Sequence, residues 1–252
     1  MREEWAILLL AIQFLTRVPV PACAGFTPER LTAATRYYPL VGAMIGGFGA
    51  LVYALALLAW PPMVAALLSI AATIALTGAF HEDGLADMLD GVGGGLTRER
   101  TLEIMKDSRI GTYGAAGLIM ALLLKAATLA SMPMASVALA LVAGHALSRF
   151  SAVMVIATSA YVRDHGTAKP VAEGVNRASL WIAGATSLAC CVALAWGLGP
   201  MPALLGVVGL VLGHLAMRRV FERKVGGYTG DCLGATQQGS ELGLYLGLLA
   251  WL

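Results

Sequence analysis

Three aspartates recur at helical spacing shortly after His81. Asp83, Asp87 and Asp90 stand at positions i, i+4 and i+7, so on an α-helix they share one stripe. Carboxylates this close resist ionising together unless a cation lies among them. Oxygen ligands without thiolates favour Mg²⁺ or Mn²⁺, which commonly bridge carboxylates to substrate phosphates. A solvated acidic helix end is the alternative, but no Lys or Arg intervenes before Arg98. The stripe therefore predicts Mg²⁺ bound by these three aspartates, and a diphosphate substrate.

A glycine-rich segment and a group of charged residues follow the aspartates. Residues 93–95 are all glycine, and Lys106, Asp107 and Arg109 come shortly after them. A glycine hinge permits closure over an anionic ligand, and a guanidinium can hold two phosphate oxygens at once. We expect Lys106 and Arg109 to bind substrate phosphates. Asp107, or an aspartate that the metal leaves free, is the expected proton acceptor.

Asp231 is a further acidic candidate, in a second glycine-rich segment. It follows the run Gly226-Gly227-Tyr228-Thr229-Gly230 and precedes the last apolar segment of the chain. Two interpretations stay open at this point. Asp231 is the N-cap of the last helix, a position that favours aspartate, or it joins the metal and substrate site.

The composition places this chain in a membrane. Of its 252 residues, 58% are hydrophobic and 13% are charged, and the mean hydropathy is +0.77. A soluble domain carries about 25% charged residues. The formal net charge of +2 is too small and too dispersed for a nucleic-acid surface. The lipid bilayer is therefore the expected surrounding, and nucleic acid is excluded as a partner.

Apolar runs predict the helices that must position these residues. Most are near the roughly 20 residues that a helix needs to cross the hydrocarbon. The expected fold is an all-α polytopic membrane helix bundle, a single domain over 1–252 with about seven spans. The run 5–15 is too short to span, so we expect it to be an interfacial or re-entrant helix. The expected spans are 39–60, 63–80, 114–132, 134–160, 179–197, 202–217 and 232–252.

The basic residues indicate how the spans are oriented. Fourteen of the seventeen Lys and Arg residues lie in the alternate segments 16–38, 81–113, 161–178 and 218–231. Basic loops stay on the cytoplasmic side. We therefore expect a multi-pass protein of the cell (inner) membrane, with the aspartates facing the cytoplasm and the C-terminus outside.

Ionisable residues lie inside two neighbouring predicted spans, 114–132 and 134–160. Lys125 is in the middle of one span, and His145 and Arg149 share one face of the next. Such groups are costly in lipid, so they usually face a cavity or a partner. They favour a secondary transporter as the non-enzyme alternative. Against it, the aspartate stripe is at a helix edge, whereas coupling sites usually lie at the midplane.

Three motifs carry a resemblance to the cobalamin synthase family, the adenosylcobinamide-GDP ribazoletransferases. They are the runs 81–91, 104–114 and 230–235, which read HEDGLADMLDG, IMKDSRIGTYG and GDCLGA. The resemblance extends from FLTRVP at 14–19 to the last helix. It implies a Mg²⁺-dependent transfer in which adenosylcobinamide-GDP and α-ribazole, or its 5′-phosphate, give adenosylcobalamin, or its phosphate, and GMP. The ribazole 5′-hydroxyl is the expected nucleophile. The resemblance leaves a homo-oligomer and contacts with enzymes of the same pathway open.

A looser similarity links the run 83–90 to the CDP-alcohol phosphotransferases. The motif of that family starts with Asp-Gly-x-x-Ala-Arg, whereas this chain has Asp87 at the arginine position. The spacing to the later aspartates of that family is also absent. A lipid phosphotransferase is therefore kept as a second enzymatic alternative, without a transfer of residue roles.

Overall fold

The computed structural model describes residues 2–21, 25–163 and 174–252. Within these residues the regular secondary structure is helical, apart from one bridge between Tyr161 and Tyr228. This confirms the expected all-α fold. The elements are α1 Arg2–Leu15, α2 Pro28–Ala34, the 3₁₀ helix η2 Thr35–Tyr37, α3 Tyr38–Ala56, α4 Pro62–Thr77, α5 Phe80–Gly94, α6 Arg98–Ile104, α7 Thr112–Ser131, α8 Met134–Thr158, α9 Arg177–Leu198, α10 Pro200–Val225 and α11 Gly230–Leu249.

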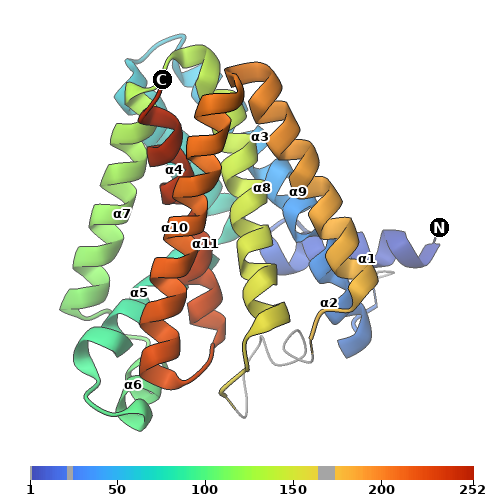
Figure 1. The fold of residues 1–252 in the computed structure, drawn as a ribbon, viewed down its shortest axis with the longest axis vertical. Coiled ribbons are helices and arrows are strands. Elements are labelled where there is room, and N and C mark those ends of the chain that lie inside the picture. Colours follow the sequence, from blue (N-terminus) through green and yellow to red (C-terminus); the bar gives the residue numbers. More distant parts are fainter. Residues whose placement is uncertain (1, 22–24, 164–173) are drawn as a thin grey trace.

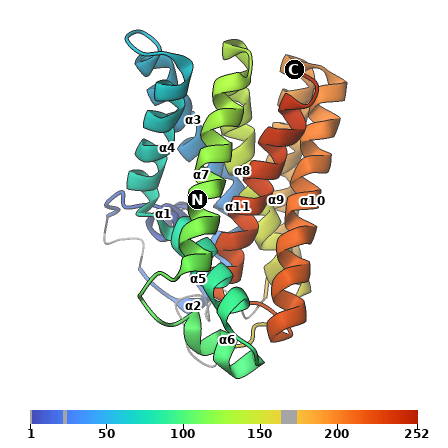
Figure 2. The same cartoon turned by 90° about the vertical axis from the view of Figure 1, so that its left-hand side faces the viewer.

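The long helices form an up-and-down bundle. Helices α3, α4 and α7 to α11 run along its long axis in alternating directions (Figures 1 and 2). Short connections at Pro61, Pro133 and Gly199 join them at one end. Helices α5 and α6 lie at the other end, together with the segments that precede α9 and α11. The charged segments thus share one end of the bundle, although residues 164–173 of the basic segment 161–178 lie outside the described residues.

The number of membrane spans differs from the expectation. Among the described helices, five are long and apolar enough to cross a bilayer, and the bent pair α4–α5 would make a sixth. The expected count of seven is not confirmed, because α11 is missing from this set. It carries Gln237, Gln238 and Glu241, all of them buried. Helix α11 packs against α5, α7, α8 and α10, so its polar side chains meet protein rather than lipid.

Helix α1 lies across the bundle instead of along it (Figure 1). Its 14 residues reach only about 21 Å at 1.5 Å per residue. Ile7, Leu10 and Ala11 are buried against the bundle, whereas Trp5 is exposed. This arrangement fits the expected interfacial helix, and it brings Phe14 and Leu15 to the side of α3.

Exposed tryptophans mark two levels on the bundle. Tryptophan prefers the boundary between hydrocarbon and water. Trp60 follows α3, Trp196 ends α9 and Trp251 follows α11, so these three lie at the end with the short connections. Trp5 in α1 and Trp181 at the start of α9 lie toward the other end. Their exposed fractions are 60% (Trp5), 52% (Trp60), 79% (Trp181), 92% (Trp196) and 60% (Trp251). The two groups indicate the two faces of the bilayer.

Candidate active site

A sharp turn between α4 and α5 sets the direction of the aspartate stripe. Gly78 and Ala79 both have left-handed backbone conformations, with φ of 70° and 58°, and the two helices meet at 91°. A left-handed conformation is unstrained for glycine but costs a residue such as alanine about 1–3 kcal/mol. The turn directs α5 across the end of the bundle, so its aspartates face the segments that lead into α7 and α11.

The Asp90 side chain caps the start of α7. Its two carboxylate oxygens accept hydrogen bonds from the backbone N–H groups of Gly111 (2.7 Å) and Gly114 (2.8 Å). Gly111 is the N-cap of α7 and has no side chain to satisfy the free N–H groups there. The negative charge also lies favourably at a helix N-terminus. Asp90 therefore has a structural task, and its expected role as a catalytic metal ligand stays a prediction.

Asp231 lies beside the stripe because two glycines let α5 and α11 touch. A Cβ atom on Gly84 would lie 3.1 Å from the Cα atom of Asp231, and one on Gly234 would lie 2.9 Å from the carbonyl oxygen of His81. The N-cap of α11 is Thr229, whose hydroxyl accepts the N–H of Cys232. The interpretation of Asp231 as the N-cap is therefore wrong, and its carboxylate lies beside the stripe instead of capping the helix.

Asp83, Asp87 and Asp231 concentrate negative charge at this crossing. Asp83 is exposed and Asp87 is half-buried. The Asp87 carboxyl lies within electrostatic range of the carboxylates of Asp231, Asp83 and Asp90. Among the described residues, the cation in contact with these carboxylates is Arg163, whose guanidinium lies 2.8 Å from a carboxylate oxygen of Asp231. We call Asp83, Asp87 and Asp231 the acidic cluster.

The acidic cluster fits a metal ion that arrives with phosphate ligands. No three His, Cys, Asp or Glu side chains of the described ranges are placed to hold an ion among themselves. Magnesium is usually held by one or two carboxylates together with substrate phosphates, because it keeps several water or phosphate ligands. Two of the three carboxylates of the cluster, those of Asp83 and Asp231, line one cavity.

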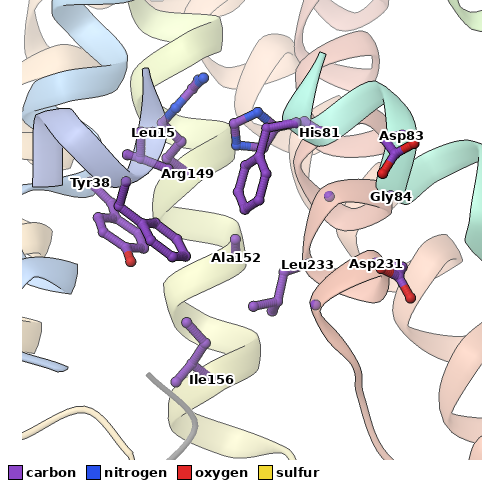
Figure 3. A pocket seen from close by; sticks show the side chains of 14 residues that line it. Leu15, Tyr38, His81, Asp83, Gly84, Arg149, Ala152, Ile156, Asp231 and Leu233 are labelled. Carbon is purple, nitrogen blue, oxygen red and sulfur yellow. The ribbon is translucent and has the colours of Figure 1, made fainter. Parts of the chain in front are cut away.

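That cavity, of about 150 Å³, lies between α1, α3, α5, α8 and α11. Tyr38 lies on one side of it, and Asp83 and Asp231 lie on the opposite side (Figure 3). Aromatic rings form much of the wall. Phe14 stacks on Tyr38 with ring centroids 5.8 Å apart, and it meets Phe80 edge to face at 5.4 Å. The cavity therefore combines an aromatic wall with two carboxylates.

Two buried polar side chains form one end of the cavity. His81 and Arg149 lie together there, and Ile156 lies at the other end (Figure 3). Arg149 precedes Ile156 by two turns of α8 and so lies deeper in the bundle. Its Nη1 donates to the carbonyl oxygen of His145 at 2.9 Å. Its Nε is buried without a partner in the described structure.

A buried polar network lies behind Arg149. Lys125 of α7 forms an ion pair with Glu241 of α11 at 2.8 Å and donates to Gln238 at 2.7 Å. Gln238 donates in turn to Glu82 of α5 at 2.8 Å. The sequence singled out Lys125, His145 and Arg149 as transporter features. The structure instead gives Lys125 a carboxylate partner within the bundle.

The charged residues after the glycine segment lie outside the cavity. Asp107 and Arg109 form an exposed ion pair at 2.7 Å and line a separate open pocket with Asp90. Lys106 is exposed and lines neither space. The Arg109 guanidinium lowers the pKa of the Asp107 carboxyl to about 2. A carboxylate that holds its proton so weakly is a poor general base at neutral pH.

Sequence comparisons give the family of this chain. Residues 7–249 match the family model described as Cobalamin-5-phosphate synthase. The chain belongs to this family. A curated relative named Adenosylcobinamide-GDP ribazoletransferase, from Ralstonia pickettii (strain 12J), is 49% identical over 255 residues, which cover 100% of this chain and 98% of the relative.

Relatives from other bacteria carry the same printed name. One from Leptothrix cholodnii is 50% identical over 259 residues, covering 98% of this chain and 96% of the relative. One from Vibrio cholerae is 41% identical over 259 residues, covering 100% and 96%. No solved structure matches. The resemblance that the three motifs carried is thus confirmed over nearly the whole chain.

The motifs alone did not reveal the rest of the cavity. The aromatic wall comes from Phe14, Tyr38 and Phe80, which are far apart in the sequence and look like ordinary apolar residues. One signal was available for the buried network. Gln237 and Gln238 interrupt the last apolar run, and Glu241 follows within one helical turn, a pattern that a lipid-facing helix would not carry.

Proposed function

We propose that this chain is an adenosylcobinamide-GDP ribazoletransferase. The observation that carries the proposal is the acidic cluster at an aromatic cavity, in a chain whose residues 7–249 match the family. Relatives that share the name are up to 50% identical to it over nearly their full length. The substrates would be adenosylcobinamide-GDP as donor and α-ribazole, or its 5′-phosphate, as acceptor.

The reaction breaks the phosphoanhydride bond of the donor and forms a phosphate ester bond to the acceptor. A ribose hydroxyl oxygen of the acceptor bonds to the phosphorus that carries the cobinamide. The bond from that phosphorus to the bridging oxygen breaks, and GMP leaves with the bridging oxygen. The family description names a 5-phosphate product, and a phosphorylated 5′-oxygen cannot attack. The expectation of a 5′-hydroxyl nucleophile therefore does not hold for the phosphorylated acceptor, and a secondary ribose hydroxyl takes its place.

The acidic cluster would provide the charge and the base for this exchange. A bound Mg²⁺ would neutralise charge on the diphosphate and on the departing GMP. Asp83 and Asp231 line the cavity and are suited to hold that ion. Asp87, half-buried and within electrostatic range of both, is the proposed acceptor for the hydroxyl proton. Asp107 is not, because its pKa is about 2.

We infer that this site faces the cytoplasm of the cell (inner) membrane. The cluster lies at the end of the bundle where the charged segments gather. Basic segments remain cytoplasmic. Large polar nucleotides could then reach the carboxylates from water.

Product analysis tests the proposal. Purified protein is incubated with adenosylcobinamide-GDP, α-ribazole 5′-phosphate and Mg²⁺, and the products are separated by chromatography. We expect equal amounts of GMP and adenosylcobalamin 5′-phosphate. Transfer from CDP-diacylglycerol in vesicles, with no GMP formed from the cobinamide donor, would instead establish a lipid phosphotransferase. Ion-driven uptake without any phosphoryl transfer would establish a transporter.

A further inference from the structure

Arg149 is a buried cation without a carboxylate partner in the described structure. Its exposed fraction is 2%. No Asp or Glu oxygen of the described residues lies within 4.0 Å of it, and Glu241 and Glu82 act on it only at longer range. Glu241 is already occupied, because it pairs with Lys125 at 2.8 Å and accepts the Tyr245 hydroxyl at 3.2 Å. A buried charge is costly unless it is paired and hydrogen-bonded.

The unused polar atoms around Arg149 belong to the cavity lining. The Nε of Arg149 and the hydroxyl of Tyr38 are buried without partners in the described structure, and both residues line the cavity. His81 lies beside Arg149 at the same end. Unsatisfied buried groups of this kind are rare in folded proteins. An anionic ligand at this end would satisfy the Nε of Arg149.

The lining of the cavity favours the acceptor over the donor. The donor carries a corrin ring and a guanosine, far larger than a space of about 150 Å³. Only its diphosphate would approach, and the acidic cluster is the place for a metal-bound diphosphate. The acceptor is smaller, with a flat aromatic base. The rings of Phe14, Tyr38 and Phe80 suit such a base, because aromatic groups pack favourably in stacked and edge-to-face arrangements.

We propose that Arg149 binds the phosphate of a phosphorylated acceptor and makes the enzyme select an aromatic nucleoside monophosphate over the free nucleoside. This inference rests on the proposed function and adds a specificity residue to it. A guanidinium can offer two parallel N–H groups to phosphate oxygens. Nε and Nη2 of Arg149 make no hydrogen bond to the described residues, whereas Nη1 is held by His145.

The position of Arg149 also fixes the orientation of the acceptor. The cationic end and the acidic cluster occupy different parts of the cavity wall (Figure 3). A phosphate held by Arg149 keeps the negative charge of the acceptor away from Asp83 and Asp231. The ribose hydroxyls then lie between the two, where one of them can meet the donor phosphorus. The free nucleoside lacks this anchor and binds with less order.

The test compares two acceptors in two variants. Steady-state kinetics are measured with saturating donor, using α-ribazole 5′-phosphate and α-ribazole, for the wild type, Arg149→Gln and Arg149→Lys. Arg218→Gln is the matched control, because Arg218 pairs with Glu222 at 3.0 Å, donates to Thr158 of α8 and does not line the cavity. The wild type should prefer the phosphorylated acceptor in kcat/KM. Arg149→Gln should reduce that preference about tenfold to a hundredfold, the range that one lost charge-assisted hydrogen bond gives.

The loss should appear in the KM for the phosphorylated acceptor, not in the KM for the donor, and Arg218→Gln should keep the wild-type preference. An unchanged preference in Arg149→Gln would overturn the inference, and so would a rise confined to the KM for the donor. If Arg149→Gln is inactive with both acceptors, Arg149→Lys decides. Recovery of turnover with the phosphorylated acceptor supports the inference, and equal loss with both acceptors overturns it. A wild type inactive with both acceptors would instead contradict the proposed function.

Discussion

At the scale of single residues, the four aspartates of the site have different tasks. Asp90 accepts two backbone N–H groups at the start of α7. Asp83 and Asp231 line the cavity, and Asp87 is within electrostatic range of both without lining it. Residues that share one helical stripe in the sequence therefore do not share one function, since the neighbours of each side chain decide what it can do.

Replacing Asp83 by Asn should abolish turnover without disturbing the fold. The exposed side chain of Asp83 makes no hydrogen bond or ion pair in the described structure, so the amide is tolerated. The loss of its charge removes a ligand from the proposed metal site and should reduce kcat at least about 10²-fold. Rates of GMP release and the elution profile in detergent measure the two effects. Full activity would contradict a role for Asp83 in catalysis.

Asp90→Ala should lower the stability of the protein, whatever its effect on catalysis. The substitution leaves the N–H groups of Gly111 and Gly114 without their acceptor, which costs about 1–3 kcal/mol per buried group. The melting temperature in detergent should fall, and Asp90→Asn should retain part of the stability because its amide oxygen can accept one bond. An unchanged melting temperature with complete loss of turnover would show that Asp90 is chiefly a ligand.

Asp107→Asn should retain most of the activity and leave the pH dependence unchanged. Because Arg109 lowers the pKa of Asp107 to about 2, the carboxylate stays ionised above that pH and takes up a proton only as the pH falls through it. It therefore does not titrate across the working range. A pH–rate profile from pH 5 to 9 is the measurement. Loss of an acidic limb in the variant would restore Asp107 as the general base.

Residue types and spacing were sufficient to find part of the site. They identified Asp83 and Asp87, and they left open two tasks for Asp231. They did not identify Asp90 as a capping residue, because Gly111 and Gly114 are more than 20 positions away and only the fold brings them together. The sequence singled out Arg149 as a group that faces a cavity or a partner, but not the aromatic residues that line the cavity with it, for the same reason.

At the scale of elements, the contact between α5 and α11 assembles the acidic cluster. Gly234→Ala should disturb it, because the added Cβ would lie 2.9 Å from the backbone oxygen of His81. A shift of a few tenths of an ångström between the helices should reduce kcat about tenfold, since 1 Å of misplacement can cost about 10²-fold. Gly47→Ala is the control, because its Cβ would meet nothing within 4 Å. Equal activity of both variants would contradict this account.

Helices α1, α5 and α11 show the limits of hydropathy as a guide to elements. The short apolar run at 5–15 gave α1 as a non-spanning helix. The turn at Gly78 and Ala79 was not visible, because alanine carries no signal for a left-handed conformation. The run 232–252 does correspond to a long helix, but its glutamines and Glu241 face protein, so it is a polar helix enclosed by apolar ones.

At the scale of the whole molecule, the C-terminus and the acidic cluster lie at opposite ends of the bundle (Figure 1). If the cluster faces the cytoplasm, a reporter fused after Leu252 must lie outside. A C-terminal alkaline phosphatase fusion should be active, and a fusion of the same enzyme in the segment between α5 and α6 should be inactive. The reverse pattern would place the site on the external face and contradict the proposed access from the cytoplasm.

The account as a whole depends on the acidic cluster carrying out phosphoryl transfer. The most direct measurement is the initial rate of GMP release from adenosylcobinamide-GDP by purified protein, with and without Mg²⁺ and acceptor, for the wild type and Asp83→Asn. We predict rapid release only for the wild type with both Mg²⁺ and acceptor present. Release that is equally fast in Asp83→Asn, or that does not need the acceptor, would contradict the account.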